Sequence, residues 1–280
     1  MRFLTLSLLA LMASPGAAAD CPGNPAALGT ARVLAIDPAQ TAPVGRKQFP
    51  QTLPLESKEV LLTFDDGPSP GATDRVLAAL QRECVHATFF MLGRNAAAHP
   101  GLAKRVLAEG HTVAHHSYRH PLLNRMSLER AEAEIDLGIA AVEAAVYGEP
   151  GGPPRTPFFR FPGFASSPAL LERLKARGIA VFGADLWPGD WNPMTPKRER
   201  TLLLKRLTAV GGGIVLLHDT QAKTAAMLPE LLRELKRGGY RMCISCRAPL
   251  RTRVKRSHGA SHQLFPRALN MTADNAVLPA

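Results

Sequence analysis

The stretch LLTFDDGP at residues 61–68 is an apolar run that ends abruptly in two acids, a glycine and a proline. Residues 60–64 are expected to form a buried β-strand, because a short apolar run bounded by turn residues is typical of strands in parallel sheets. Asp65 and Asp66 then lie where this strand ends. Adjacent carboxylates repel each other unless a proton or a cation lies between them. The stretch therefore predicts a metal site at the end of a buried strand.

On both sides of this strand, short apolar runs alternate with helical patterns along the chain. Strands are expected at residues 60–64, 87–92, 112–115, 158–161, 180–184, 214–217 and 240–244. Helices are expected at residues 73–83, 102–109, 127–147, 168–177, 196–210 and 222–237. Strands that alternate with helices of this length imply βαβ units and a parallel sheet. About seven such repeats predict an α/β fold in the form of a (β/α) barrel rather than an open sheet.

Polar side chains gather where the expected strands end. The residues at or just after these ends are Asp65, Asp66, His116, His120, Arg160, Asp190 and His218. Active sites of parallel barrels are built at the carboxyl ends of the strands. We therefore expect these side chains to form one site.

The segment GHTVAHHSYRHP at residues 110–121 carries histidines four residues apart, which one helical turn would place on the same face. His116 and His120 together with Asp66 supply two imidazoles and one carboxylate. This set leaves coordination positions open for water and substrate, as a catalytic metal site requires. Zn²⁺ is the expected ion, although the same ligands suit Co²⁺ or another divalent cation. The neighbouring His111 and His115 are expected to be structural.

At this point the chain, from about residue 58 to residue 244, resembles the polysaccharide deacetylases of carbohydrate esterase family four, which contain a NodB homology domain. Five motifs occur in the family's order: TFDDG at 63–67, HSYRH at 116–120, RFPG at 160–163, DW at 190–191 and LLH at 216–218. The resemblance implies a distorted NodB-type barrel. It also implies a hydrolase of carbon–nitrogen bonds other than peptide bonds, which removes N-acetyl groups from chitooligosaccharide, peptidoglycan or another N-acetylglucosamine polymer.

The resemblance assigns the first two motifs to the metal and the base. Asp65 would be the catalytic base, and Asp66, His116 and His120 would bind the metal. Arg160, in the third motif, would orient the base and keep it ionised. A divalent metal would polarise the acetyl carbonyl and lower the pKa of a bound water from 15.7 to as little as about 7.

The remaining motifs are implied to handle the leaving amine and the substrate. His218 would be the general acid, and Asp190 would raise the pKa of His218 and fix its orientation. Trp191 would form a wall of the substrate groove, and Leu216 would line the acetyl pocket. The third motif departs from the family's usual Arg-Pro-Pro-Tyr-Gly, because Gly163 stands where the family has tyrosine. The backbone N–H of Gly163 would still bind the oxyanion, whereas the shape of the groove would change.

Two other functions are compatible with the same motifs. An O-acetyl esterase acting on a xylan-like polysaccharide would use the same chemistry, because metal-activated water attacks esters more readily than amides. A catalytically inactive carbohydrate-binding barrel would keep the fold but not the chemistry. Retention of every acid, base and ligand argues against an inactive barrel.

The N-terminal residues predict export. Residues 1–19 have a basic start, an apolar run and the small residues Ala17-Ala18-Ala19, so they are expected to be a signal peptide cleaved before Asp20. The apolar run is about ten residues, too short to span a bilayer as a helix. Residues 20–57 are expected to be an extended lead-in, 58–246 the catalytic domain and 247–280 a basic, flexible tail. We therefore expect a periplasmic or extracellular protein without a transmembrane span.

The formal net charge of +11, which becomes +10 if Arg2 is lost with the leader, suits anionic surroundings such as a cell wall. Nucleic acid is not expected as a partner, because the chain has no nucleic-acid-binding motif and is expected to be exported. Four cysteines, at positions 21, 84, 243 and 246, permit disulfides in an exported protein, and their pairing is open. For the spacing of Cys243 and Cys246, a structural disulfide is favoured over a metal or redox site, and Cys84 is read as a small buried hydrophobe.

Overall fold

A computed structural model describes residues 21–149 and 151–248. The expected signal peptide and nearly all of the expected basic tail lie outside these ranges. Eight parallel strands form the centre of the molecule: β1 Thr30–Ile36, β2 Glu59–Asp65, β3 Thr88–Met91, β4 Thr112–His115, β5 Phe158–Phe159, β6 Ala180–Val181, β7 Gly213–His218 and β8 Arg241–Arg247. The α-helices are α1 Ala72–Arg82, α2 Gly93–Ala98, α3 Pro100–Ala108, α4 Leu128–Tyr147, α5 Pro168–Ala176, α6 Pro196–Val210 and α7 Ala222–Arg237. Two short 3-10 helices are η1 Leu123–Arg125 and η2 Pro162–Phe164.

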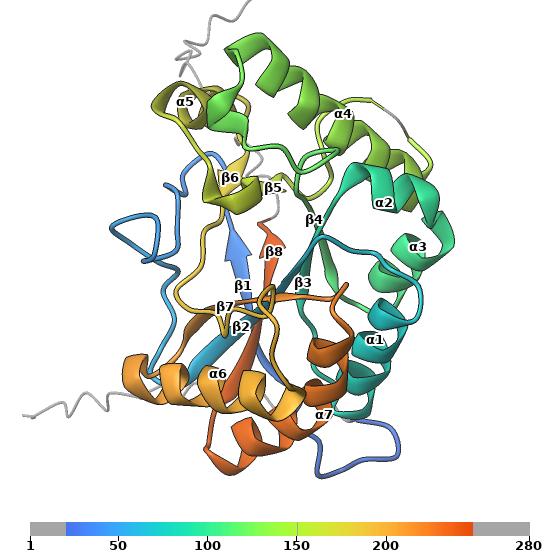
Figure 1. Ribbon diagram of the computed structural model, residues 1–280, viewed down its shortest axis with the longest axis vertical. Helices are drawn as coiled ribbons and strands as arrows, with labels where there is room; N and C mark the ends of the chain where they lie inside the picture. The colour runs from blue at the N-terminus through green and yellow to red at the C-terminus, as the bar shows by residue number, and fades with distance from the viewer. Residues whose placement is uncertain (1–20, 150, 249–280) are drawn as a thin grey trace, which may run out of the picture. The chain divides into compact units, whose positions relative to one another are not determined.

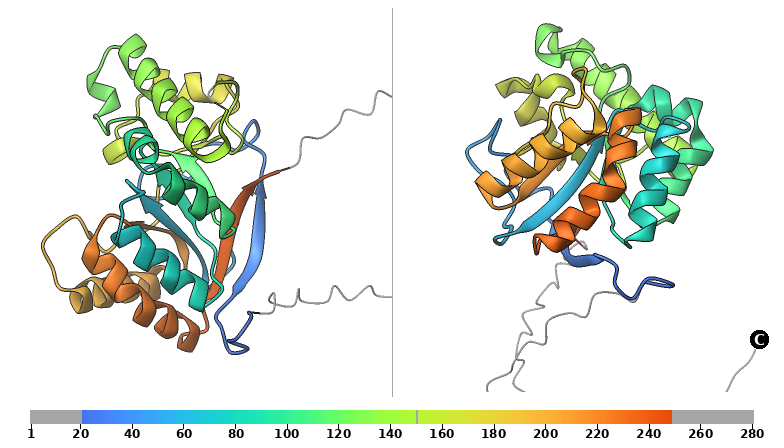
Figure 2. Two further views of the ribbon diagram at one scale, coloured as in Figure 1. Left: turned by 90° about the vertical axis from the view of Figure 1, so that its right-hand side faces the viewer. Right: turned by 60° about the horizontal axis from the view of Figure 1, so that its bottom comes forward.

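The strands close into a distorted barrel, as predicted. The ladder runs in the order β7, β2, β3, β4, β5, β6, with every neighbouring pair parallel. A bridge between Leu186 and Val215 then joins the segment after β6 back to β7. Strand β8 pairs with the first half of β2, and β1 pairs with β8. Figure 1 shows the helices arranged around the strands, and the left view of Figure 2 shows β1 and β8 on the side away from most of the helices.

Strand β2 explains how the core and the site are linked. All seven of its residues are buried, as in a strand of a parallel sheet that is covered on both faces. Because successive side chains alternate between faces, Leu62 and Phe64 pack against the helices, whereas Leu61 belongs to a second cluster with Phe90 and Ile214. Asp65 lies on the same face as Leu61. The final carboxylate of the strand is therefore buried beneath the site.

One strand and one α-helix were not predicted, and β5 and β6 are only about half as long as expected or less. Strand β1 lies inside the segment read as an extended lead-in, and α2 follows β3 directly. β5 and β6 have two residues each, because the chain after them continues extended without a full ladder.

The segment around Arg46 and Thr52 is fixed to the barrel by the buried carboxylate of Asp185, which accepts from the Arg46 N–H at 2.8 Å and the Thr52 hydroxyl at 2.7 Å.

The expectation that Cys243 and Cys246 take part in a structural disulfide is wrong, and so is the interpretation of Cys84 as a small buried hydrophobe. Cys21 is bonded instead to Cys84, while Cys243 and Cys246 are free thiols. Both free cysteines lie on β8, three residues apart, so their side chains point to opposite faces of the strand and their Cα atoms are separated by about 10 Å. A disulfide needs Cα atoms within about 7 Å.

No helix in the described ranges is both long enough and apolar enough to cross a membrane.

Candidate metal centre and active site

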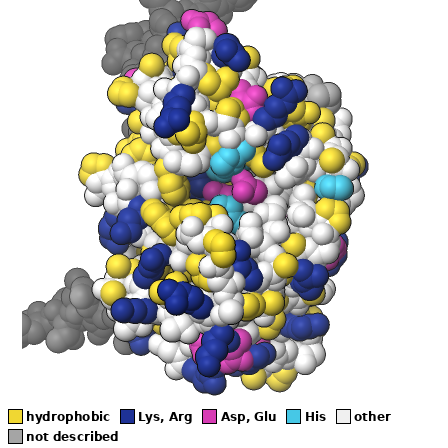
Figure 3. Space-filling view, in the orientation of Figure 1, with side chains coloured by type: hydrophobic (Ala, Val, Ile, Leu, Met, Phe, Trp, Pro, Cys, Tyr) yellow, Lys and Arg dark blue, Asp and Glu magenta, His cyan; other side chains and the backbone are white. Residues whose placement is uncertain are grey.

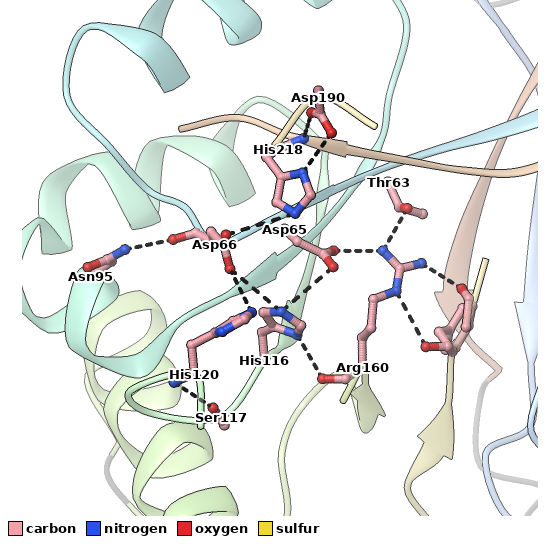
Figure 4. A network of polar contacts seen from close by, with 12 residues as sticks. Thr63, Asp65, Asp66, Asn95, His116, Ser117, His120, Arg160, Asp190 and His218 are labelled. Atoms are coloured by element: carbon pink, nitrogen blue, oxygen red, sulfur yellow. Dashed lines mark hydrogen bonds and ion pairs between the residues drawn. The ribbon is translucent and has the colours of Figure 1, made fainter. Parts of the chain in front are cut away.

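The register of the barrel brings the predicted residues to one rim. Asp65 is level with His218 on β7, and His115 is level with Met91 on β3 and with Phe159 on β5. The residues that follow these strand ends, Asp66, His116 and Arg160, therefore lie side by side. Figure 4 shows these side chains converging from several strands.

Asp66, His116 and His120 offer ligand atoms that all lie within 4.8 Å of one another. The Asp66 Oδ1 atom is 3.6 Å from the Nε2 atom of each histidine. This oxygen is buried and receives no hydrogen bond from the part of the chain that the structure describes. A buried carboxylate oxygen without a donor, facing two imidazole nitrogens, fits a divalent cation.

Hydrogen bonds hold Asp66 and His116 in place. The Asn95 amide donates to the backbone carbonyl of Asp66 at 2.7 Å. His116 Nδ1 is 2.8 Å from the backbone carbonyl of Arg160, so Nδ1 carries the proton and Nε2 presents its lone pair to the site. Burial lowers the pKa of His116 to about 3, which keeps the ring in the neutral form that a metal requires.

The two histidines do not share a helical turn, which corrects the geometry expected from their spacing. Residues 116–120, here called the metal-site loop, are irregular, with a φ of 64° at Ser117 and 70° at His120. The His120 N–H donates to the Ser117 hydroxyl at 3.1 Å and closes the loop. This left-handed backbone, rather than helical periodicity, directs both imidazoles toward Asp66.

Helix α4 supports the metal-site loop from behind. The Glu134 carboxylate accepts from the backbone N–H groups of Tyr118, at 3.1 Å, and Arg119. Gly138 packs directly beneath the loop, and a Cβ atom at this position would lie 2.3 Å from the carbonyl carbon of Ser117. These contacts fix the loop across a long separation in sequence.

Asp65 forms a buried ion pair with Arg160, whose Nη1 atom is 2.6 Å from the Asp65 carboxylate. Arg160 is completely buried and also donates to the Thr63 hydroxyl and the Gly183 carbonyl, both at 2.8 Å. Burial raises the pKa of Asp65 above its ordinary value, although the charges of Arg160 and His218 oppose the shift. A carboxylate with a raised pKa takes a proton more readily, which suits a general base.

His218 lies on the other side of the metal centre and is held by Asp190. Its Nδ1 atom is 2.9 Å from Asp190 Oδ1, and its backbone N–H donates to Asp190 Oδ2 at 2.7 Å. Burial lowers the pKa of His218, but the hydrogen bond to Asp190 and the charges of Asp190, Asp65 and Asp66 outweigh it and raise the pKa to about 9. His218 is therefore cationic at neutral pH, with Nε2 facing Asp66 Oδ2 at 3.9 Å.

A cavity of about 380 Å³ opens above these residues. Its walls include Gly163 and Leu216, and Figure 3 shows acidic and histidine side chains in the hollow with hydrophobic side chains along one edge. Ring centroids follow one another from Phe164 to Trp187 at 5.5 Å, to Trp191 at 6.0 Å and to His218 at 5.8 Å. Trp191 is half exposed. This aromatic strip offers apolar faces on which a sugar ring can stack.

Gly163 lines this cavity from η2, where its backbone has a φ of 55°. Its N–H donates no hydrogen bond to any residue that the structure describes. Gly163 therefore presents a free backbone donor beside the metal centre.

The structure brings together all ten residues that the motifs single out. Eight of them line the cavity, with His116 almost completely buried, whereas Arg160 and Asp190 lie behind Asp65 and His218. His111 and His115 lie apart from the triad, because each makes buried hydrogen bonds within the fold. Sequence reasoning missed the support given by Asn95, Glu134 and Gly138. A glycine inside a long amphipathic helix is itself a signal of close packing.

Comparison with known proteins identifies the family of this chain. The family model described as polysaccharide deacetylase matches residues 53–182. The chain is 36% identical over 198 residues to the peptidoglycan-N-acetylglucosamine deacetylase of Bacillus cereus, covering 68% of this chain and 87% of that protein. This chain belongs to the polysaccharide deacetylase family.

Two further relatives extend well beyond the region that they share with this chain. The chain is 37% identical over 186 residues to the peptidoglycan-N-acetylglucosamine deacetylase PgdA of Listeria monocytogenes, covering 66% of this chain but only 37% of that protein. The solved structure of a peptidoglycan deacetylase from Bdellovibrio bacteriovorus superimposes with a TM-score of 0.68 at 30% identity, over 78% of this chain and 59% of that chain. The fold is therefore shared, while the longer relatives contain regions that this chain does not match.

Proposed function

We propose that this chain is a metal-dependent polysaccharide deacetylase that hydrolyses the N-acetyl groups of an N-acetylglucosamine polymer or oligomer. The observation that carries the proposal is the placement of a buried base, Asp65, and a cationic acid, His218, on two sides of the Asp66, His116 and His120 triad. Peptidoglycan is the favoured substrate class, because the relatives compared above are named as peptidoglycan deacetylases.

A divalent cation held by the triad would polarise the acetyl carbonyl and make a water molecule more acidic. Asp65 takes the proton of the attacking water, and Arg160 holds the carboxylate in position. When the C–N bond breaks, His218 donates its Nε2 proton to the nitrogen of the sugar. The products are acetate and a free amine, and the imidazole left on His218 stays oriented by Asp190.

The cavity wall supplies the remaining contacts. Gly163 lines the cavity, and its backbone N–H would donate to the oxygen of the tetrahedral intermediate, a contact that typically contributes about 3 to 4 kcal/mol. Leu216 lines the part of the cavity that would receive the acetyl methyl group, and Trp191 offers its exposed ring to the sugar.

Zn²⁺ is the proposed ion, because two imidazoles and one carboxylate with open positions suit it, although Co²⁺ fits the same ligands. Cleavage of a signal peptide before Asp20 and export of the protein are part of the proposal, supported by the residue pattern of the first nineteen positions. A catalytic domain at 58–246, a mobile tail after it and contact of the basic chain with an anionic cell wall stay predictions.

A product assay tests this function. Purified, metal-loaded protein is incubated with N-acetylated chitooligosaccharides, with peptidoglycan fragments and with O-acetylated xylan, and free amine and acetate are measured in parallel. The proposal expects equal amounts of amine and acetate from the amino-sugar substrates. Acetate without amine, released from xylan alone, would identify an O-acetyl esterase. No release from any substrate by protein that retains its metal would favour an inactive carbohydrate-binding barrel.

A further inference from the structure

A buried threonine lies between two carboxylates behind the proposed acid. The Thr224 hydroxyl oxygen, on α7, is 2.7 Å from Glu199 Oε1 on α6 and 3.1 Å from Asp190 Oδ2. All three residues are completely buried. A hydroxyl group carries a single hydrogen, so Thr224 can donate to only one of the two carboxylates.

The hydrogen bonds of Asp190 show which carboxylate is charged. Both of its oxygens accept hydrogen bonds from His218, one from the ring and one from the backbone. Asp190 therefore acts as an ionised acceptor that stabilises the cationic ring. If Glu199 were ionised as well, one of the two short contacts to Thr224 would be between oxygens with no hydrogen between them. Such a contact is costly in a buried site.

The surroundings of Glu199 also disfavour a charge. Its Oε2 atom has no hydrogen-bond partner among the described residues, and no ion pair to Glu199 is formed there. The groups that face it are Asp190, His218 from β7 and Lys223 from α7. The Lys223 ammonium group donates to the Gln221 side chain at 3.1 Å, and His218 is paired with Asp190. Neither cation neutralises Glu199 directly.

We propose that Glu199 is a positioning residue that stays protonated and donates its carboxyl hydrogen to Thr224, which turns the Thr224 hydroxyl toward Asp190. The role in catalysis rests on the proposed function of His218 as the acid. The chain of donors runs from Glu199 to Thr224 to Asp190, and Asp190 accepts from His218. A neutral Glu199 fixes Asp190 through Thr224 and adds no second negative charge behind the imidazolium.

The ionisation of Glu199 is consistent with this arrangement. Burial raises the pKa of Glu199 to about 7; a hydrogen bond donated by Thr224 opposes the shift, and the charge of Asp190 adds to it. When the Thr224 hydrogen points toward Asp190, the opposing hydrogen bond is withdrawn. The proton on Glu199 is then held more firmly.

Infrared spectroscopy tests the protonation directly. Metal-loaded wild type at neutral pH should show the carbonyl stretch of a protonated carboxylic acid, and Glu199→Gln should lose intensity in this band. Asp219, whose pKa burial also raises to about 7, contributes to the same region, so the difference between variants is the measured quantity. Glu230→Gln on α7 is the matched control, because Glu230 is paired with arginines and should contribute no such band.

Kinetics test the positioning role. Glu199→Gln should keep kcat and KM within about twofold of the wild type, because its amide N–H donates to Thr224 as the carboxyl group does. Thr224→Val keeps the shape but removes the hydroxyl, so kcat should fall about threefold to tenfold while KM is unchanged. Glu199→Gln should also fold at neutral pH, because it replaces a neutral group by a neutral group.

Three outcomes would overturn the proposal: an infrared band unchanged in Glu199→Gln, a fall in kcat in that variant as large as in Thr224→Val, or failure of Glu199→Gln to fold. The spectroscopic result does not depend on turnover. If the wild type had no deacetylase activity, the proposed function would fail while the protonation of Glu199 could still be read from the spectra.

Discussion

Replacing each of the two adjacent acids by its amide should separate the base from the metal ligand. Asp65→Asn and Asp66→Asn are the same chemical change at neighbouring positions, so each is the matched control for the other. Asp65→Asn leaves the triad unchanged and should retain the metal while turnover falls by about 10² to 10⁴, as expected for the loss of a general base. Asp66→Asn removes the carboxylate charge from the triad and should lose both metal and turnover.

The structure predicts a second difference, in stability. Asp65 forms the only ion pair of Arg160 among the described residues, and the guanidinium group is completely buried. Removing one partner of a buried ion pair typically costs about 3 to 5 kcal/mol, because the other charge is left uncompensated. The asparagine oxygen can still accept a hydrogen bond from Arg160, so a loss of free energy of unfolding of about 3 kcal/mol is expected. Asp66 contacts its nearest cation, His218, only at 3.9 Å, so metal-free Asp66→Asn should lose less stability than metal-free Asp65→Asn.

Three measurements on each variant check these expectations: metal content by elemental analysis, kcat for deacetylation, and the free energy of unfolding of metal-free protein in urea. Circular dichroism confirms that the protein assayed is folded. If Asp65→Asn lost its metal while Asp66→Asn kept it, the two roles would be exchanged. If metal-free Asp65→Asn were as stable as metal-free wild type, the ion pair between Asp65 and Arg160 would not contribute to the free energy of unfolding as expected.

Three further changes test other parts of the structure. Because His218 must be cationic and its pKa is raised to about 9, kcat should fall as pH rises through this value, and Asp190→Asn should move that fall toward lower pH in a pH–rate profile. Gly138→Ala should lower metal content and kcat together, since its Cβ atom would lie 2.3 Å from the backbone of the metal-site loop, whereas the exposed neighbour Leu137→Ala should change neither. Cys84→Ser opens a disulfide that spans 63 residues and should lower the free energy of unfolding by about 4 kcal/mol in a denaturant titration; an unchanged value would show that the bond adds no stability.

The sequence predicts the regular part of the fold well, because its signals are local. The bounds expected for β4, α6 and α7 agree with the structure at both ends. Strand β1 was missed because it is a partly exposed strand at the edge of the sheet, within a segment rich in proline and alanine, so its apolar pattern is weak. Its place is fixed by pairing with β8, more than two hundred residues away in the chain. Local patterns carry no information about such a partner.

The candidate site can likewise be predicted only in part from the sequence. Metal ligands, base and acid can be proposed from sequence because each task requires a particular residue type, and the motifs place these types at strand ends. The irregular backbone of the metal-site loop could not be predicted, since it depends on Glu134 and Gly138 of α4. The pairing of Cys21 with Cys84 is also decided by tertiary contact, because the N–H of Gly29 donates to the Glu83 carbonyl and holds the N-terminal segment beside the end of α1.

The balance of buried charge explains why the acids of this site must differ in protonation. Arg160 and His218 are its cations, and three carboxylates, those of the base, the metal ligand and the partner of the acid, face them. This leaves an excess of one negative charge, which a bound divalent cation would more than offset. Ionised Glu199 and Asp219 would add two more negative charges in places without a cation partner, and burial raises the pKa of both to about 7. A buried charge without compensation is among the most costly features of a protein interior. These two acids therefore hold a proton at higher pH than ordinary carboxyl groups do, although sequence alone presents all five as equivalent carboxylates.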